Sequence, residues 1–168
     1  MLLCQECGKT TILRDLIRSL SSGIKEIKFK AVNVSVVDER GEIGALYKGK
    51  PQNDLGVKVD ILENVSKAIG INMLVRTMSP RIIVVDEIGN IEDVEAINYA
   101  MCSGTKGIFS VHGSILEDLY LNPIIKELIS LNIIERIIFL DDKKKGALKD
   151  IYYLDKQTKE YIKGEKMF

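Results

Sequence analysis

The chain has 168 residues, and 24 lysines and arginines balance 24 aspartates and glutamates, so its formal net charge is zero. Its content of 46% hydrophobic and 29% charged residues is ordinary for a globular protein and excludes a chain disordered throughout. A chain of this length predicts one domain, or one domain with a small appendage, and it buries roughly 70% of its unfolded surface, so its core needs no disulfide or structural metal. The balanced charge argues against a protein built mainly to coat nucleic acid, because such binding depends on many phosphate-neutralising cations.

The cysteines and the N-terminal residues indicate the compartment. Cys4, Cys7 and Cys102 are too few, and odd in number, for a disulfide scaffold, so we expect reduced thiols. Cys4 and Cys7 form a C-x-x-C pair, but no second pair completes a zinc site, and an incidental pair is favoured over a redox or metal pair. No apolar run approaches the ~18 residues of a membrane helix, and no signal peptide is visible. We therefore expect a cytoplasmic protein.

Helical and strand-like segments alternate along the chain. The apolar spacing predicts helices over 11–21, 66–78, 91–103, 115–120 and 123–131. Strands are expected over 31–37, 81–85, 106–111 and 134–140. Residues 41–56, rich in Gly, Pro, Asn and Asp, indicate a long functional loop. This alternation predicts an α/β fold with a mostly parallel sheet.

The C-terminal region has a different pattern. Residues 150–154 and 160–163 predict antiparallel hairpin strands at the edge of the sheet. The charge run over 141–145 is interpreted as a solvated turn. A nucleic-acid-binding patch at lysines 143–145 is the less favoured interpretation, because neighbouring acids offset their charge.

Gly8-Lys9-Thr10-Thr11 opens the first expected helix and matches the second half of the phosphate-binding motif G-x-x-x-x-G-K-[ST]. In such a loop, helix-start amides face the phosphates, the lysine reaches the β- and γ-phosphates and the hydroxyl ligates Mg²⁺. The alternative without chemistry is a glycine turn before a threonine-capped helix. Leu3 stands where the motif has its first glycine, and at most three residues of the preceding strand are present. We therefore expect that strand to be truncated, or its place in the sheet to be taken by another segment.

Acidic residues follow the strand expected over 81–85. Asp86 and Glu87 would lie at the carboxyl edge of the sheet, where α/β proteins bind ligands. Asp86 is expected in the shell of the magnesium ion, and Glu87 is expected to orient or deprotonate the attacking water. Two further strand ends repeat this pattern: the acidic pair and arginine of Asp38-Glu39-Arg40, and His112, which we interpret as a γ-phosphate sensor. Combined with the lysine motif, these residues favour nucleotide hydrolysis.

Six stretches together resemble the stage III sporulation protein AA family of endospore-forming bacteria, which is related to the hexameric secretion and pilus-assembly ATPases. They are CGKTTILRDLIR (7–18), VVDERGEI (36–43), PQNDLGVKVDIL (51–62), RTMSPRIIVVDEIG (76–89), EDVEAI (92–97) and VHG (111–113). The resemblance implies that residues 1–168 are a RecA-like P-loop ATPase domain, a three-layer α/β sandwich with antiparallel C-terminal edge strands and a truncated first strand. It also implies an ATP-driven ring that powers or gates a channel between mother cell and forespore, with membrane proteins of that channel as partners.

The resemblance assigns roles to residues of this sequence. Nucleotide binding falls to Cys7, Gly8, Lys9, Thr10 and Thr11, and Mg²⁺ binding to Thr10 and Asp86. The expected catalytic residues are Glu87 of the Walker B pair, Glu39 at the position of an acidic box, His112 at the position of a histidine box, and Arg76. The cation that reaches the γ-phosphate could be Arg76, Arg40 or Arg81, from the same subunit or across an interface.

Two other classes of function are weighed against an ATPase. A scaffold that keeps the fold without binding nucleotide is favoured by Leu3 and disfavoured by the acids Glu39, Asp86 and Glu87, because a scaffold has no need for converging carboxylates. A single-stranded nucleic-acid motor would need a basic groove with stacking aromatic residues. The four phenylalanines and six tyrosines show no such clustering.

Overall fold

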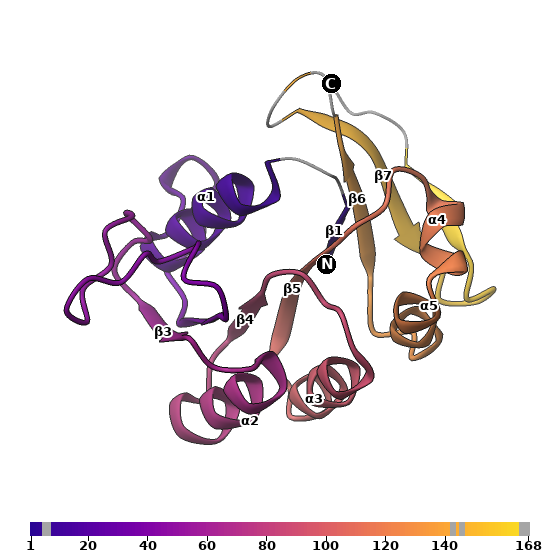
Figure 1. Cartoon of the computed structure of the whole chain (residues 1–168). Coiled ribbons are helices and arrows are strands. Elements are labelled where there is room, and N and C mark those ends of the chain that lie inside the picture. The colour runs from indigo at the N-terminus through magenta and orange to yellow at the C-terminus, as the bar shows by residue number, and fades with distance from the viewer. Residues whose placement is uncertain (5–7, 142–143, 145–146, 165–168) are drawn as a thin grey trace.

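A single mixed sheet forms the centre of the computed structural model, which describes residues 1–4, 8–141, 144 and 147–164 (Figure 1). Within these residues the strand order is β3-β2-β4-β5-β1-β6-β7-β8. The strands are β1 (Leu2–Cys4), β2 (Val34–Asp38), β3 (Val59–Glu63), β4 (Ile82–Val85), β5 (Lys106–Val111), β6 (Arg136–Leu140), β7 (Leu148–Leu154) and β8 (Tyr161–Lys163). The helices are α1 (Lys9–Ser22), α2 (Lys67–Met78), α3 (Ile91–Cys102), α4 (Leu116–Leu121), α5 (Pro123–Ser130) and the short 3₁₀ helix η1 (Lys25–Ile27).

The direction of the strands divides the sheet into two parts. From β3 to β6 every neighbouring pair is parallel, and β7 and β8 then add antiparallel strands at the C-terminal edge. Parallel strands bring all their carboxyl ends to one edge of the sheet. This arrangement confirms the predicted α/β fold with a mostly parallel sheet and antiparallel C-terminal strands.

Helices cover both faces of the sheet, giving three layers (Figure 1). On one face, Leu13 and Ile17 of α1 pack against alternate strand residues such as Val84. On the other face, α2, α3, α4 and α5 pack against the intervening residues, including Val85 and Phe109. Because side chains alternate across a strand, burial on both faces requires the continuous apolar runs from which these strands were predicted.

The first strand occupies the centre of the sheet. Residues 2–4 pair in parallel with both β5 and β6, and Leu3 is opposite Ser110 on one side and Ile138 on the other. The expectation that another segment takes this place is therefore wrong, because these three residues themselves satisfy the strand edges of both neighbours. Leu3, at the position of the first glycine of the motif, is buried in the core formed with α1.

One edge of the sheet was predicted from the sequence and the other was not. The β3 strand was not expected, and its sequence VDILE combines three apolar residues with the acids Asp60 and Glu63, as suits a half-buried edge strand. The C-terminal hairpin strands were predicted correctly. Of the predicted turn at 141–145, only Asp141 and Lys144 are among the described residues, and Lys144 is exposed. None of the helices in the described ranges combines the length and the hydrophobicity needed to cross a bilayer.

Candidate active site

The lysine motif lies at the carboxyl edge of the sheet, where α1 begins. Gly8 precedes the helix with φ 84° and ψ 0°, a left-handed conformation that favours glycine because it has no Cβ. Lys9 is buried although it is a lysine, and its Nζ lies 3.3 Å from both the Val111 carbonyl oxygen and His112 Nδ1. Residues 5–7, which include the predicted nucleotide-binding residue Cys7, lie outside the described residues. The amino group of Lys9 is thus held at the end of β5.

Thr10 and Asp86 bring two side-chain oxygens together. Thr10 Oγ1 donates a hydrogen bond of 3.4 Å to Asp86 Oδ2, which joins the first turn of α1 to the end of β4. Hydroxyl and carboxylate oxygens are ligands suited to Mg²⁺, which usually keeps several waters and takes the rest of its ligands from phosphates. Among the described residues, no three His, Cys, Asp or Glu side chains form a metal-binding group. The pair therefore fits Mg²⁺ held jointly with a nucleotide and does not resemble a closed structural metal site.

Glu87 contacts side chains from two other strand ends. Its carboxylate pairs with Arg40 Nη1 at 2.6 Å through Oε2, and His112 Nε2 lies 3.4 Å from Oε1. These three side chains and Lys67 line a cavity of about 280 Å³. The structure thus brings together Lys9, Asp86, Glu87 and His112, which the sequence placed separately on α1, β4 and β5.

The two acids at the end of β2, Asp38 and Glu39, have different partners. Asp38 is buried and accepts hydrogen bonds from the backbone amides of Glu42, Ile43 and Gly44, at 2.9, 2.9 and 2.7 Å. Glu39 instead forms an ion pair with Lys67 at the start of α2. The two carboxylates therefore do not converge: Asp38 anchors the loop, and Glu39 reaches the edge of the cavity through Lys67.

We expect Asp38→Ala to lower the free energy of unfolding by about 3 kcal/mol, because the substitution removes hydrogen bonds to a charged group and leaves buried amides without acceptors. Urea unfolding followed by circular dichroism measures the change. Asp54→Ala is the matched control, since Asp54 accepts one backbone hydrogen bond, from Gly56 at 3.0 Å, on the exposed surface. A loss below about 1 kcal/mol in Asp38→Ala would contradict the anchoring role.

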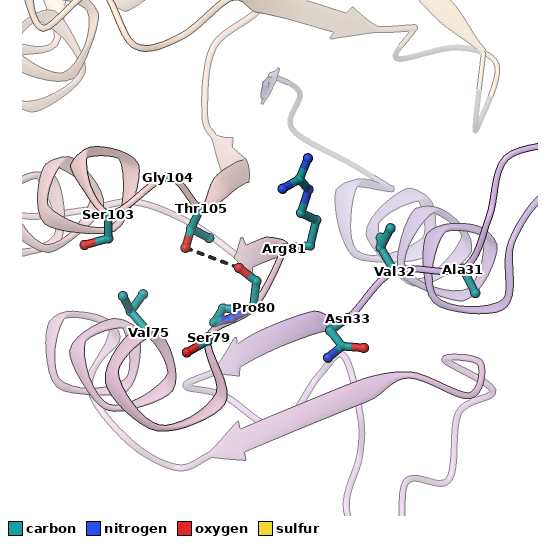
Figure 2. A pocket seen from close by; sticks show the side chains of 10 residues that line it. All are labelled: Ala31, Val32, Asn33, Val75, Ser79, Pro80, Arg81, Ser103, Gly104 and Thr105. Atoms are coloured by element: carbon teal, nitrogen blue, oxygen red, sulfur yellow. Dashed lines mark hydrogen bonds between the residues drawn. The ribbon is translucent and has the colours of Figure 1, made fainter.

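The three candidate arginines lie in different places. Arg40 contacts Glu87, whereas Arg76, near the C-terminal end of α2, stacks its guanidinium 5.7 Å from the ring centre of Tyr99. Arg81 precedes β4 and so lies at the opposite edge of the sheet from Asp86, which follows it. Figure 2 shows Arg81 beside the Thr105–Pro80 hydrogen bond, in a separate cavity of about 500 Å³. Within one chain, only Arg40 of these three reaches the site.

Sequence reasoning missed two residues of the site, Lys67 and Ser110. Ser110 is fully buried in β5, and its hydroxyl donates a hydrogen bond to Asp86 Oδ1 and accepts one from the Glu87 amide. The signal that could have revealed Ser110 was a serine between the apolar residues Phe109 and Val111, two residues before His112. Lys67 carried no comparable signal, since a lysine at the start of a helix is usually exposed.

The C-x-x-C pair gains no support as a reactive site. Cys4 is buried in β1, and burial raises the pKa of its thiol to about 12, although the nearby charge of Lys9 acts in the opposite direction. A thiol with this pKa stays protonated and unreactive at neutral pH. Its partner in the motif, Cys7, lies outside the described residues.

Comparison with solved structures identifies the class of protein that has this fold. The chain is similar to the ATPase DotB of Legionella pneumophila, with a TM-score of 0.65 and 14% identity over 94% of this chain and 46% of that one. It is also similar to the VirB11 ATPase of the Brucella suis type IV secretion system in complex with sulphate (TM-score 0.58, 18% identity, 90% of this chain and 47% of that one). The pilus retraction motor PilT with bound ADP is similar as well, with a TM-score of 0.59 and 20% identity over 90% of this chain and 45% of that one. At these identities the similarity shows the fold alone, which is the RecA-like fold of secretion ATPases.

Comparison with known sequences identifies the family as well as the fold. The family described as "Sporulation stage III, protein AA" matches residues 1–159. The stage III sporulation protein AA of Bacillus subtilis (strain 168) is 39% identical over 151 residues, which cover 89% of this chain and 48% of that protein. The chain therefore belongs to the stage III sporulation protein AA family, as its motifs predicted, and it spans about half the length of this relative.

Proposed function

We propose that the chain is an ATPase domain that binds and hydrolyses Mg-ATP at the carboxyl edge of its sheet. The observation that carries this proposal is the set of contacts that joins Lys9 to His112, His112 to Glu87, and Thr10 to Asp86. One phosphate-binding cation, one pair of metal-ligating oxygens and one carboxylate base within a single cluster are the groups that phosphoryl transfer requires. Membership of the family and the ATPase fold of the structural neighbours support it.

The nucleotide would be held by the start of α1. Gly8, Lys9, Thr10 and Thr11 would bind its phosphates together with Cys7, and the first-turn amides favour anions because they have no partners within the helix. Thr10 and Asp86 would hold Mg²⁺. When bound, this ion neutralises charge that develops on the phosphate oxygens.

Glu87 would accept a proton from the attacking water at one of its carboxylate oxygens. In the structure Arg40 and His112 each face one of these oxygens, so both oxygens are engaged. A carboxylate oxygen can accept more than one hydrogen bond, so the attacking water would bind Glu87 beside these two contacts or take the place of one of them. Glu39, linked to the same cavity by Lys67, is the second acid that we assign to catalysis.

The family membership supports a wider role. We propose a homo-oligomer, a hexameric ring in the cytoplasm, that powers or gates a channel between mother cell and forespore and meets membrane proteins of that channel. Arg76 and Arg81, which lie away from the site of their own chain, would then act on nucleotide only in a neighbouring subunit.

A scaffold without nucleotide is the second candidate. It is favoured by Leu3, which fills the position of the first glycine with a buried side chain. Titration calorimetry of the chain with Mg-ATP, followed by an assay of phosphate release, separates the two candidates. Saturable binding with turnover is the expected result, and the absence of binding would favour the scaffold.

A further inference from the structure

We infer that Ser110 is a positioning residue that sets the orientation of both Asp86 and Glu87, and that it controls how strongly Mg²⁺ contributes to nucleotide binding. This inference rests on the proposed function. Ser110 lies in β5, outside the lysine motif and outside the acidic strand end. It acts through these two neighbours and need not contact the nucleotide itself.

One hydroxyl group joins the two acids. Ser110 Oγ donates its only hydrogen to Asp86 Oδ1 and accepts a hydrogen bond of 2.8 Å from the Glu87 amide. The carbonyl oxygen of Ser110 accepts a third hydrogen bond, of 3.0 Å, from the Ile88 amide. The segment 86–88 is therefore fastened to β5 by three successive bonds to a single residue.

The backbone of Glu87 needs such support. Its φ of 55° lies in the left-handed region, which is unfavourable for a residue with a Cβ and persists only where the surroundings enforce it. The hydrogen bond from the Glu87 amide to Ser110 Oγ fixes the peptide that sets this conformation. Without the hydroxyl, only the hydrogen bond from the Ile88 amide to the Ser110 carbonyl oxygen would remain, and we expect the carboxylate of Glu87 to leave its place between Arg40 and His112.

The position of Asp86 depends on Ser110 in a different way. Its two oxygens are held separately, Oδ2 by Thr10 and Oδ1 by Ser110. A metal ion bound by Thr10 and Asp86 would replace the contact between them, and Ser110 would then remain as the group that aims the carboxylate. Groups that orient metal ligands in this way typically change metal affinity or activity by 10- to 100-fold when removed, so a similar effect of about 10- to 100-fold is expected here.

The burial of Ser110 indicates that its hydroxyl group needs the hydrogen bonds that it makes. It is fully buried between Phe109 and Val111, and an unpaired hydroxyl would destabilise such a position. Ser35 in β2 is the matched control. It is also fully buried in a central strand, but within the described residues its Oγ has no hydrogen-bond partner.

The experiment compares Ser110→Ala, Ser110→Thr and Ser35→Ala with the unsubstituted chain. Affinity for ADP is measured by calorimetry with Mg²⁺ and with EDTA, and kcat and KM for ATP are measured across Mg²⁺ concentrations. In Ser110→Ala we expect kcat to fall about 10- to 100-fold and the half-saturating Mg²⁺ concentration to rise about 10-fold. Affinity for ADP in EDTA should stay within about twofold, because the lysine motif is intact. Ser110→Thr should restore kcat and the half-saturating Mg²⁺ concentration, and Ser35→Ala should leave these two values unchanged.

The possible outcomes distinguish failure of this inference from failure of the proposed function. If the unsubstituted chain binds Mg-ADP and Ser110→Ala shows the same Mg²⁺ dependence and kcat, the inference is overturned and the proposed function stands. If Ser110→Ala only lowers the melting temperature, as a general packing defect would, it is likewise overturned. Absence of nucleotide binding by the unsubstituted chain overturns the proposed function and this inference with it. If Ser110→Ala does not fold, Ser110→Cys, which keeps a side chain of similar size but bonds weakly, has the same expected results.

Discussion

Replacing Lys9 by alanine is expected to remove measurable ATP binding, with affinity falling by at least about 100-fold, because hydrogen bonds to charged groups contribute about 1.5–3 kcal/mol each. The Lys9 amino group lies at the first turn of α1, 3.3 Å from His112 Nδ1, where the phosphates would meet the helix-start amides. Calorimetric titration with Mg-ATP measures the loss. Circular dichroism checks that the fold persists, because Lys9 is buried and its Nζ contacts the Val111 carbonyl oxygen and His112 Nδ1.

Lys149→Ala is the matched control for this substitution. Lys149 is partly exposed and also donates to a backbone carbonyl, that of Ser114 at 3.1 Å, and among the described residues no hydrogen bond or ion pair joins it to Asp86, Glu87 or His112. Its affinity for ATP should match that of the unsubstituted chain. If Lys9→Ala binds ATP as tightly as this control, the phosphates are not bound by the start of α1, and the site assignment fails.

The parts of the fold that could be predicted are those where burial alone determines the pattern of apolar residues. The strands β4 and β5 are buried on both faces, so their apolar runs are unambiguous. The β3 strand was missed because an edge strand is half exposed, and its acids interrupt the apolar pattern. The central role of β1 could not be seen in three residues, because its place depends on β5 and β6, which lie more than one hundred residues further along the chain.

The candidate site was predictable to a similar extent. Strand ends of a parallel sheet share one edge, so the grouping of Asp86, Glu87 and His112 followed from topology. The separation of Asp38 from Glu39 did not, because it depends on backbone amides of residues 42–44 that turn back onto Asp38. The choice of Arg40 over the other arginines likewise required the positions of their side chains in three dimensions.

Replacing Glu87 by glutamine is expected to leave ATP binding intact and to lower kcat by about 100-fold or more, the usual contribution of a general base. Glutamine has the same shape but cannot accept a proton, and it does not alter the lysine motif or Asp86. The lost pairs with Arg40 and His112 should change the free energy of unfolding by less than about 1 kcal/mol, because the Arg40 side chain is 63% exposed and that of Glu87 is 32% exposed. Single-turnover phosphate release on pre-bound Mg-ATP isolates the chemical step.

Two further substitutions decide how the result is interpreted. Glu63→Gln is the control, since Glu63 also ends a parallel strand at this edge but accepts a hydrogen bond from the Leu46 amide at 2.8 Å, which glutamine can still accept. It should hydrolyse ATP at the unsubstituted rate. Undiminished turnover in Glu87→Gln, together with a large loss in Glu39→Gln, would move the role of the base to Glu39. The pair of Glu39 with Lys67 makes this the physical alternative, because Lys67 lines the same cavity as Glu87.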